Sequence, residues 1–288
     1  MLPVVEPTSL VSGGSSPGSI PGPTSASSSV PHASSARDAP DPRRREQLAR
    51  LAEQISVCGL CPRLVAWREQ VARERRAAFS DQEYWGRPVP GFGDPEARVC
   101  IVGLAPAAHG GNRTGRVFTG DRSGDWLYAA MWRAGFANQP TSVSVSDGLK
   151  LRGAYVLAAV RCAPPANRPT TEERDTCAPY MRRELELLDD VRVLVALGSF
   201  AYHVTARELG VRPRPVFGHG VEAPARDGRV VLCSYHPSQQ NTFTGKLTEK
   251  MLDDVLVRAR ELAGYGRARR ARRARGAHPS ASAGTVRT

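Results

Sequence analysis

Four short and nearly continuous apolar runs divide the middle of the chain. They are Arg98–Leu104, Ala154–Val160, Val191–Leu197 and Val230–Tyr235. Apolar runs of this length without polar alternation are typical of strands that are covered on both faces of a parallel sheet. The pattern therefore predicts a sheet of four parallel strands.

Helical spacing of apolar residues fills the segments before, between and after these strands. The predicted helices cover Arg44–Ile55, Gly124–Phe136, Thr170–Leu188, Ser199–Gly210 and Lys246–Leu262. The third of these opens with a capping-box sequence, in which a threonine is followed three residues later by a glutamate. Strands and helices that alternate in this way predict one three-layer α/β/α domain.

Both ends of the chain depart from this pattern. Residues 1–42 consist mainly of Ser, Pro, Gly and Ala, and residues 266–288 begin with an arginine-alanine run. Segments with so little apolar surface to bury are typically disordered. We therefore expect a folded domain over residues 43–265, between a disordered N-terminal segment and a disordered basic tail.

The charge is strongly positive and unevenly distributed. The net charge is +12, and residues 265–288 contain seven arginines and no acidic residue. Such a distribution favours a polyanionic partner, because each phosphate contact releases condensed counterions. A solvated arginine-rich surface is the alternative. No export signal or apolar run near the ~20 residues of a membrane span is evident, so we expect a cytoplasmic, nucleoid-associated protein.

Four of the six cysteines have the spacing of metal ligands. Two of them form a Cys-x-x-Cys pair, and two follow about a hundred residues later: Cys58, Cys61, Cys162 and Cys177. This spacing predicts a bound metal or cluster, and it does not separate zinc from iron–sulfur. Two disulfides or four unrelated thiols are the alternatives, of which disulfides require an oxidising compartment. Cys100 and Cys233 lie inside apolar runs, so we expect both in the core.

Three polar loops rich in glycine and proline follow the first, second and fourth predicted strands. They are Ala105–Ser123, Arg161–Pro169 and His236–Gly245. In an open parallel sheet, ligands bind beyond the carboxyl ends of the strands. The three loops therefore predict one binding site at that edge of the sheet. Neither a phosphate-binding P-loop nor a dinucleotide fingerprint is present in them.

One histidine is well placed for a function in these loops. His236 directly follows a predicted buried strand, Pro237 restricts the chain after it, and polar residues follow. These surroundings favour a functional over a structural histidine. His203 lies within a predicted helix and is expected to be structural. Of the acidic residues near the end of the first polar loop, Asp125 is expected to cap the helix that follows this loop.

Two of these loops, taken together, resemble the family 5 (type B) uracil-DNA glycosylases. The resemblance rests on the motifs Gly103–Arg116 and His236–Asn241, and it extends in order over residues 45–265. It implies a four-stranded parallel α/β/α fold. It also implies excision of uracil, and of other deaminated bases such as hypoxanthine, from double- and single-stranded DNA. For the four spaced cysteines it implies a [4Fe–4S] cluster.

The resemblance also implies roles for individual residues. His236 would hydrogen-bond the uracil oxygen, Asn167 would assist catalysis and Phe118 would stack on the base. A loop would press into the DNA through Ser238, Gln239, Gln240 and Asn241. The remaining residues expected at the substrate are Ala105, Pro106, His109, Asn112 and Ala158.

Two of these positions differ from other uracil-DNA glycosylases in a way that is characteristic of the type B family. Ala105 stands where relatives place a water-activating Asp or Asn, and Ala158 where some place the Asn that reads the uracil edge. The water-positioning group therefore stays open among Asn112, Asp121 and His109. We expect a monomer. The alternatives are a nucleic-acid-binding module without chemistry and a cluster-bearing redox protein.

Overall fold

The computed structural model describes residues 41–265 of the 288-residue chain. The segments that we expect to be disordered lie outside these residues, except for Asp41 and Pro42. These two are the N-cap and the first residue of helix α1 (Pro42–Ser56). Asp41 is the N-cap of this helix, and its side chain accepts a hydrogen bond from the backbone N–H of Arg43. The helix therefore begins two residues before the predicted start at Arg44. Over the same residues, no helix is long and apolar enough to cross a membrane.

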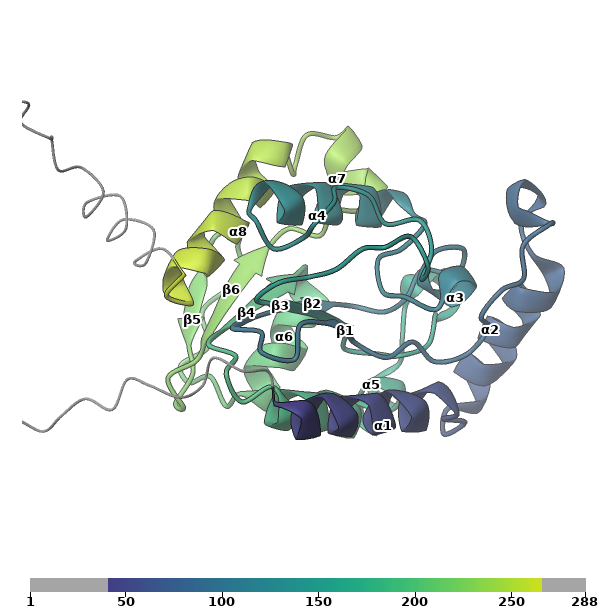
Figure 1. Cartoon of the computed structure of the whole chain (residues 1–288), viewed down its shortest axis with the longest axis horizontal. Coiled ribbons are helices and arrows are strands. Elements are labelled where there is room, and N and C mark those ends of the chain that lie inside the picture. Colours follow the sequence, from purple (N-terminus) through teal and green to yellow (C-terminus); the bar gives the residue numbers. More distant parts are fainter. Residues whose placement is uncertain (1–40, 266–288) are drawn as a thin grey trace, which may run out of the picture. The chain divides into compact units, whose positions relative to one another are not determined.

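A six-stranded sheet with the order β1-β3-β2-β4-β6-β5 forms the centre of the domain (Figure 1). The four predicted strands are its parallel middle: β2 (Val99–Gly103), β3 (Ala154–Ala158), β4 (Val193–Leu197) and β6 (Val230–Ser234). Two antiparallel edge strands extend it: β1 (Phe92–Gly93) and β5 (Glu222–Pro224). The sequence does not predict these edges, because strands of two or three residues that contain Gly or Pro give no apolar pattern.

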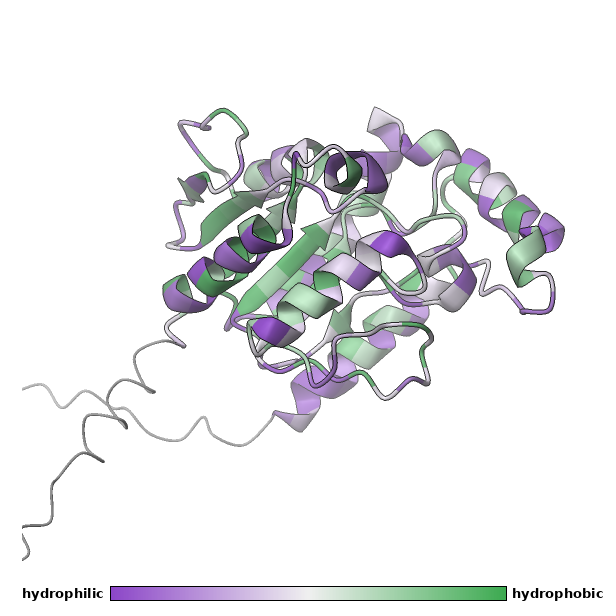
Figure 2. Ribbon diagram, turned by 90° about the horizontal axis from the view of Figure 1, so that it is seen from above, coloured by the Kyte–Doolittle hydropathy of each residue, from purple (hydrophilic) through white to green (hydrophobic). Residues whose placement is uncertain are grey.

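Successive side chains of β2 enter two separate cores. Val99 and Ile101 pack with helices α4 (Arg122–Arg133) and α8 (Glu249–Leu262) on one face of the sheet. Cys100 and Val102 pack on the other face, where α1 is joined by α5 (Thr171–Leu187) and α6 (Ser199–Glu208). Figure 2 shows the strands as largely hydrophobic and the surrounding helices as mixtures of hydrophilic and hydrophobic residues. The predicted three-layer α/β/α fold is confirmed.

The ends of several helices refine the predictions. The capping box of α5 is present, with Thr170 and Glu173 in reciprocal hydrogen bonds. Helix α6 has Gly198 as its N-cap, and the predicted cap Ser199 is the first helical residue. Helix α4 is capped by Asp121 rather than by Asp125, since the carboxylate of Asp121 accepts the backbone N–H of residue 124.

One long helix and two short ones lie outside the predicted pattern. Helix α2 (Pro62–Glu74) follows the first cysteine pair, α3 (Gly111–Thr114) lies in the loop after β2, and α7 (Gln239–Phe243) lies in the loop after β6. Charged residues interrupt the apolar spacing of α2, and the other two are too short to show a period. Both short helices therefore belong to the loops at the carboxyl edge of the sheet.

Candidate active site

A cleft of about 480 Å³ opens at the carboxyl edge of the parallel strands. All three loops that the sequence predicts to form a site contribute to it. The lining residues are Leu104, Ala105, Ala107, Phe118, Asp121, Arg122, Ser123, Asn167, His236, Ser238, Gln239 and Gln240. This volume is in the range of pockets that enclose a small organic ligand.

His236 lies half-buried in the cleft, two residues after the end of β6. The side-chain amide of Asn241 donates a hydrogen bond of 2.8 Å to its backbone carbonyl and fixes the turn after the strand. Its imidazole forms no hydrogen bond with any residue in the described part of the chain. Burial lowers the pKa of His236 to about 4. The ring is therefore neutral at physiological pH and can donate one N–H to a ligand.

Phe118 forms the wall of the cleft next to His236. The two ring centroids are 5.8 Å apart, with an angle of 36° between the planes. Phe118 has a left-handed backbone with φ of 52°, which is rare and costly for a bulky residue. It also packs so closely that a Cβ at Gly103 would lie 2.7 Å from its ring, and one at Gly124 would collide with its carbonyl oxygen. Phe118 is thus held tightly between β2 and α4.

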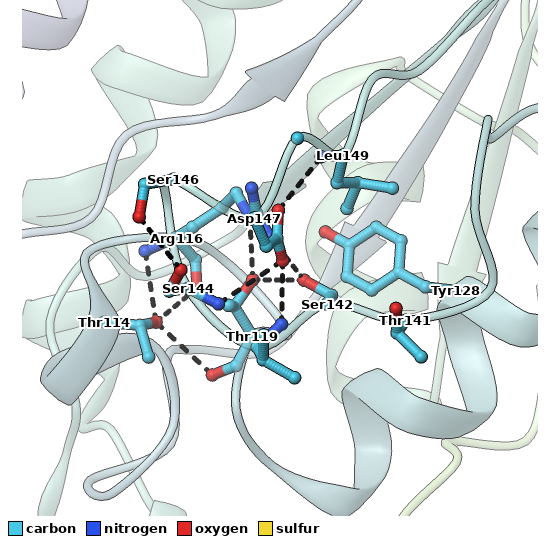
Figure 3. A network of polar contacts seen from close by, with 12 residues as sticks. Thr114, Arg116, Thr119, Tyr128, Thr141, Ser142, Ser144, Ser146, Asp147 and Leu149 are labelled. Atoms are coloured by element: carbon cyan, nitrogen blue, oxygen red, sulfur yellow. Dashed lines mark hydrogen bonds and ion pairs between the residues drawn. The ribbon is translucent and has the colours of Figure 1, made fainter.

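A buried polar network holds the segment that carries Phe118 (Figure 3). We call it the Arg116 clamp, and it consists of Arg116, Thr119, Ser142 and Asp147. The Arg116 guanidinium donates to Thr119 Oγ1 at 2.9 Å and to Ser142 Oγ at 2.8 Å. It also pairs with the Asp147 carboxylate at 2.6 Å. The clamp therefore ties Arg116 and Thr119, the residues on either side of Val117 and Phe118, to the loop before β3.

The charge state of the clamp is well defined. Burial alone would raise the pKa of Asp147, but hydrogen bonds from Arg116 and from the backbone N–H groups of residues 149, 143 and 144 lower it to about 2. Asp147 is therefore ionised at neutral pH. Further bonds fix the same backbone: Tyr128 donates its hydroxyl to the Val117 carbonyl at 2.9 Å. Together these contacts offset the strain at Phe118.

Asp121 is the one carboxylate among the residues that line this cleft. One carboxylate oxygen caps α4 by accepting the backbone N–H of Gly124 at 3.0 Å. Burial raises the pKa of Asp121, although the hydrogen bonds from the start of α4 oppose this shift. Asn167, which also lines the cleft, has a left-handed backbone with φ of 55°, and the preceding Ala166 has φ of 51°. Two such residues in succession turn the loop after β3 toward the cleft.

The four spaced cysteines line a second, much smaller cavity together with Arg68, Arg161 and Tyr180. The Arg68 guanidinium lies 3.0 Å from the sulfur of Cys162, and the backbone N–H of Arg161 lies 3.3 Å from that of Cys177. In residues 41–265, no group of three or more His, Cys, Asp or Glu is placed to hold a single metal ion. The described cysteines are all free thiols, so they form no disulfide.

The cysteine cavity adjoins the loop after β2. Ala105, which lines the cleft, also packs against the apolar cluster around Cys162 and Cys177. The side-chain amide of Asn112 donates to the backbone carbonyl of Arg68 at 3.1 Å. Ala105 therefore connects the lining of the cleft with the packing around the cysteines.

Sequence comparisons identify relatives of the whole domain. The sequence model described as "Uracil DNA glycosylase superfamily" matches residues 90–260. A "Type-5 uracil-DNA glycosylase" of Mycobacterium tuberculosis is 57% identical over 73% of this chain and 80% of its own. A protein of the same name from Thermus thermophilus is 53% identical over 74% of this chain and 96% of its own length. The chain belongs to the uracil-DNA glycosylase superfamily. Within it, the identity to type-5 members far exceeds the 27% identity to a "Type-4 uracil-DNA glycosylase" of Thermotoga maritima.

Most residues that the resemblance to uracil-DNA glycosylases singles out meet in the cleft. Those that line it are Ala105, Phe118, Asn167, His236, Ser238, Gln239 and Gln240. Asn241 lines an adjoining pocket on the other side of His236. The remaining predicted residues lie behind the cleft lining: Pro106, His109, Asn112 and Ala158.

Three of these residues have structural contacts that explain their positions. Asn112 is fully buried against α2, and His109 accepts or donates a hydrogen bond of 3.1 Å with the hydroxyl of Tyr84. Ala158 is the buried last residue of β3 and pairs in register with Gly103. The cleft also contains Leu104, Ala107, Arg122 and Ser123, which the sequence analysis did not single out as substrate residues. Their only signal in the sequence is that they lie in the predicted motif Gly103–Arg116 or in the predicted loop Ala105–Ser123.

Replacement of Asp147 by Asn tests the Arg116 clamp. The variant leaves the buried guanidinium of Arg116 without a counter-charge, and we expect a loss of about 3 kcal/mol in the free energy of unfolding at pH 7. The folded pKa of Asp147 is below its ordinary value of 3.8. The contribution of Asp147 to the free energy of unfolding is therefore complete above about pH 4, and it is lost as the pH falls toward 2. Urea unfolding of both proteins over this pH range measures the difference.

The exposed Asp125 on α4 provides the matched control, because Asp125→Asn removes a carboxylate that has no part in the clamp. This control should unfold like the wild type within about 0.5 kcal/mol. An Asp147→Asn deficit that does not change with pH would contradict the electrostatic account of the clamp.

Proposed function

We propose that this chain is a DNA-repair glycosylase that hydrolyses the N-glycosidic bond of uracil in DNA and leaves an abasic site. The observation that carries the proposal is the Phe118–His236 pair in a cleft at the carboxyl edge of the sheet. The identity of 53–57% to relatives named type-5 uracil-DNA glycosylases supports the same reaction. Because a base inside a duplex cannot reach such a cleft, the target nucleotide would be extruded from the stack.

The neutral ring of His236 would supply the main electrostatic contribution. Negative charge builds on the departing uracil as the N-glycosidic bond breaks. A neutral imidazole can donate a hydrogen bond to the uracil oxygen where that charge develops. The ring would do so without the desolvation cost of a buried cation, since its pKa is about 4.

The other residues of the cleft would hold the base and the water. Phe118 would stack on the uracil, and its tightly packed backbone fixes the plane of the ring. Asn167, from the loop after β3, would hydrogen-bond the base. With a small Ala105 in the lining, the cleft leaves space for larger deaminated bases such as hypoxanthine.

Of the three groups proposed to position the water, Asp121 has the best support. It lines the cleft, whereas Asn112 is directed toward α2 and His109 toward Tyr84. Its raised pKa makes the carboxylate a stronger hydrogen-bond acceptor for a water molecule. We propose that the enzyme acts as a monomer on DNA of the nucleoid.

We also propose that Cys58, Cys61, Cys162 and Cys177 bind a [4Fe–4S] cluster. All four line one cavity, and cysteine thiolates are the usual ligands of such clusters. Two residues that line the cavity, Arg68 and Arg161, have buried N–H groups without hydrogen-bond partners among the described residues. A negatively charged group bound by thiolates would satisfy them. The cluster would link α2 to the loop after β3 and so support the wall of the cleft.

The His236→Ala variant tests the proposed chemistry. We expect single-turnover release of uracil from a uracil-containing duplex to slow by about 10²- to 10³-fold, the usual loss for one transition-state donor. DNA affinity and melting temperature should change little, because the ring has no hydrogen bond to the described protein. Base release by the wild type is the first measurement, since a binding module without chemistry would release none.

The exposed His203 on α6 gives the matched control. His203→Ala should excise uracil at the wild-type rate. If His236→Ala also did so, His236 would be structural and the proposed mechanism would lose its main electrostatic contribution.

Removal of one proposed ligand tests the cluster. In protein purified without oxygen, we expect iron and sulfide, and we expect Cys58→Ala to lose both together with thermal stability. Cys233→Ala, which alters a core cysteine outside the cavity, should retain the iron. Zinc without iron in the wild-type protein would contradict the proposal.

A further inference from the structure

The short helix α7 ends in a phenylalanine that is directed into solvent next to the cleft. Phe243 is 67% exposed, although α7 begins with Gln239, which lines the cleft. Thr244, Gly245 and Lys246, which follow it, are exposed as well. A single exposed aromatic residue needs no explanation by itself. Its neighbours give this one a specific environment.

Two cations lie at this exposed tip. The guanidinium carbon of Arg122 is 4.5 Å from the centroid of the Phe243 ring. Arg122 also lines the cleft, so it connects the ring with the proposed binding site. The exposed Lys246 packs on a different ring, with its ammonium 5.0 Å from the centroid of Tyr235, and it lines the adjoining pocket that contains His236. Exposed aromatic surface next to two cations is suited to a ligand that has both a π-face and negative charge.

The tip is held firmly at its base. The buried Leu247 donates its backbone N–H to the carbonyl of Asn241 at 3.0 Å. The Asn241 side chain in turn donates to the carbonyl of His236. The hydroxyl of Thr244 donates to the carbonyl of Gln240 at 2.7 Å. Phe243 is therefore presented in a fixed position relative to His236, and binding there would cost little additional ordering.

We propose that Phe243 stacks on a nucleobase of the DNA that flanks the extruded nucleotide, while Arg122 and Lys246 contact the adjacent phosphates. This inference rests on the proposed function, because it places DNA across the cleft. Arg122 lies over the Phe243 ring, and the high exposure of Phe243 leaves ring surface available for a base. Stacking of this kind is independent of base sequence. A nucleobase is favoured over an apolar protein partner because a cation that lines the cleft, Arg122, packs on the ring.

Binding of a defined DNA probe tests the proposal. The probe is a duplex that contains a stable abasic-site analogue. It is prepared in three versions, with the fluorescent base 2-aminopurine on the 5′ side of the analogue, on its 3′ side or opposite it. The Phe243→Ala variant lacks one base–aromatic stack, so it should bind the probe about 5- to 150-fold more weakly than the wild type. The fluorescence change of 2-aminopurine at one of the flanking positions should be lost with it. Phe243→Trp, which retains an aromatic face, should keep both the affinity for the probe and the fluorescence change.

Trp132 provides the matched control. It is an aromatic residue that is 48% exposed, and it lies ten residues after Arg122 at the far end of α4. Trp132→Ala should bind the probe with wild-type affinity. The melting temperature of all variants should be unchanged, because neither side chain is buried.

The outcomes separate this proposal from the proposed function. Uracil release by the wild type together with unchanged probe affinity of Phe243→Ala overturns the stacking proposal alone. Loss of affinity without any position-dependent fluorescence change also overturns it, since Phe243 would then act without stacking on a flanking base. A wild-type protein that releases no uracil overturns the proposed function, and the fluorescence measurement still decides whether Phe243 stacks on DNA.

Discussion

The common direction of the four central strands is the constraint on which the site depends. Because β2, β3 and β6 run parallel, the loops that follow them leave the sheet at one edge, although 131 positions separate Ala105 from His236 in the sequence. Their polar residues therefore meet over two apolar cores that exclude water from the layers beneath. The half-buried position of His236 and its low pKa follow from this arrangement.

A second level of structure fixes the loops themselves. Phe118 adopts a strained backbone, and the Arg116 clamp holds the residues on both sides of it. Ala105 packs against the apolar cluster around the cysteines, and Asn112 joins the loop after β2 to α2. A cluster bound by the cysteines would thus act on the cleft through packing, without taking part in the reaction. Rigid presentation of Phe118 and His236 is what a preorganised electrostatic site requires.

The sequence predicts the parts of this structure that rest on local pattern. Continuous apolar runs reveal the four buried strands, and the position of His236 directly after one of them indicates its place at the sheet edge. The clamp could not be predicted, because Asp147 lies in a polar loop 31 residues from Arg116 and pairs with it only in the folded chain. The motif containing Asn112 is recognisable, but only the structure shows that the side chain is directed toward α2 rather than toward the substrate.

The central claim is that a neutral His236 stabilises the departing base in a partly buried cleft. Its most direct test is an NMR titration of the imidazole in the full-length protein, with the His236 signal assigned by its absence from His236→Ala. The account predicts a ring that stays neutral as the pH falls from 8 to 5 and becomes protonated only near pH 4. Protonation of His236 near its ordinary pKa of 6.5 would contradict the account, because the ring would then be solvated rather than held in the cleft.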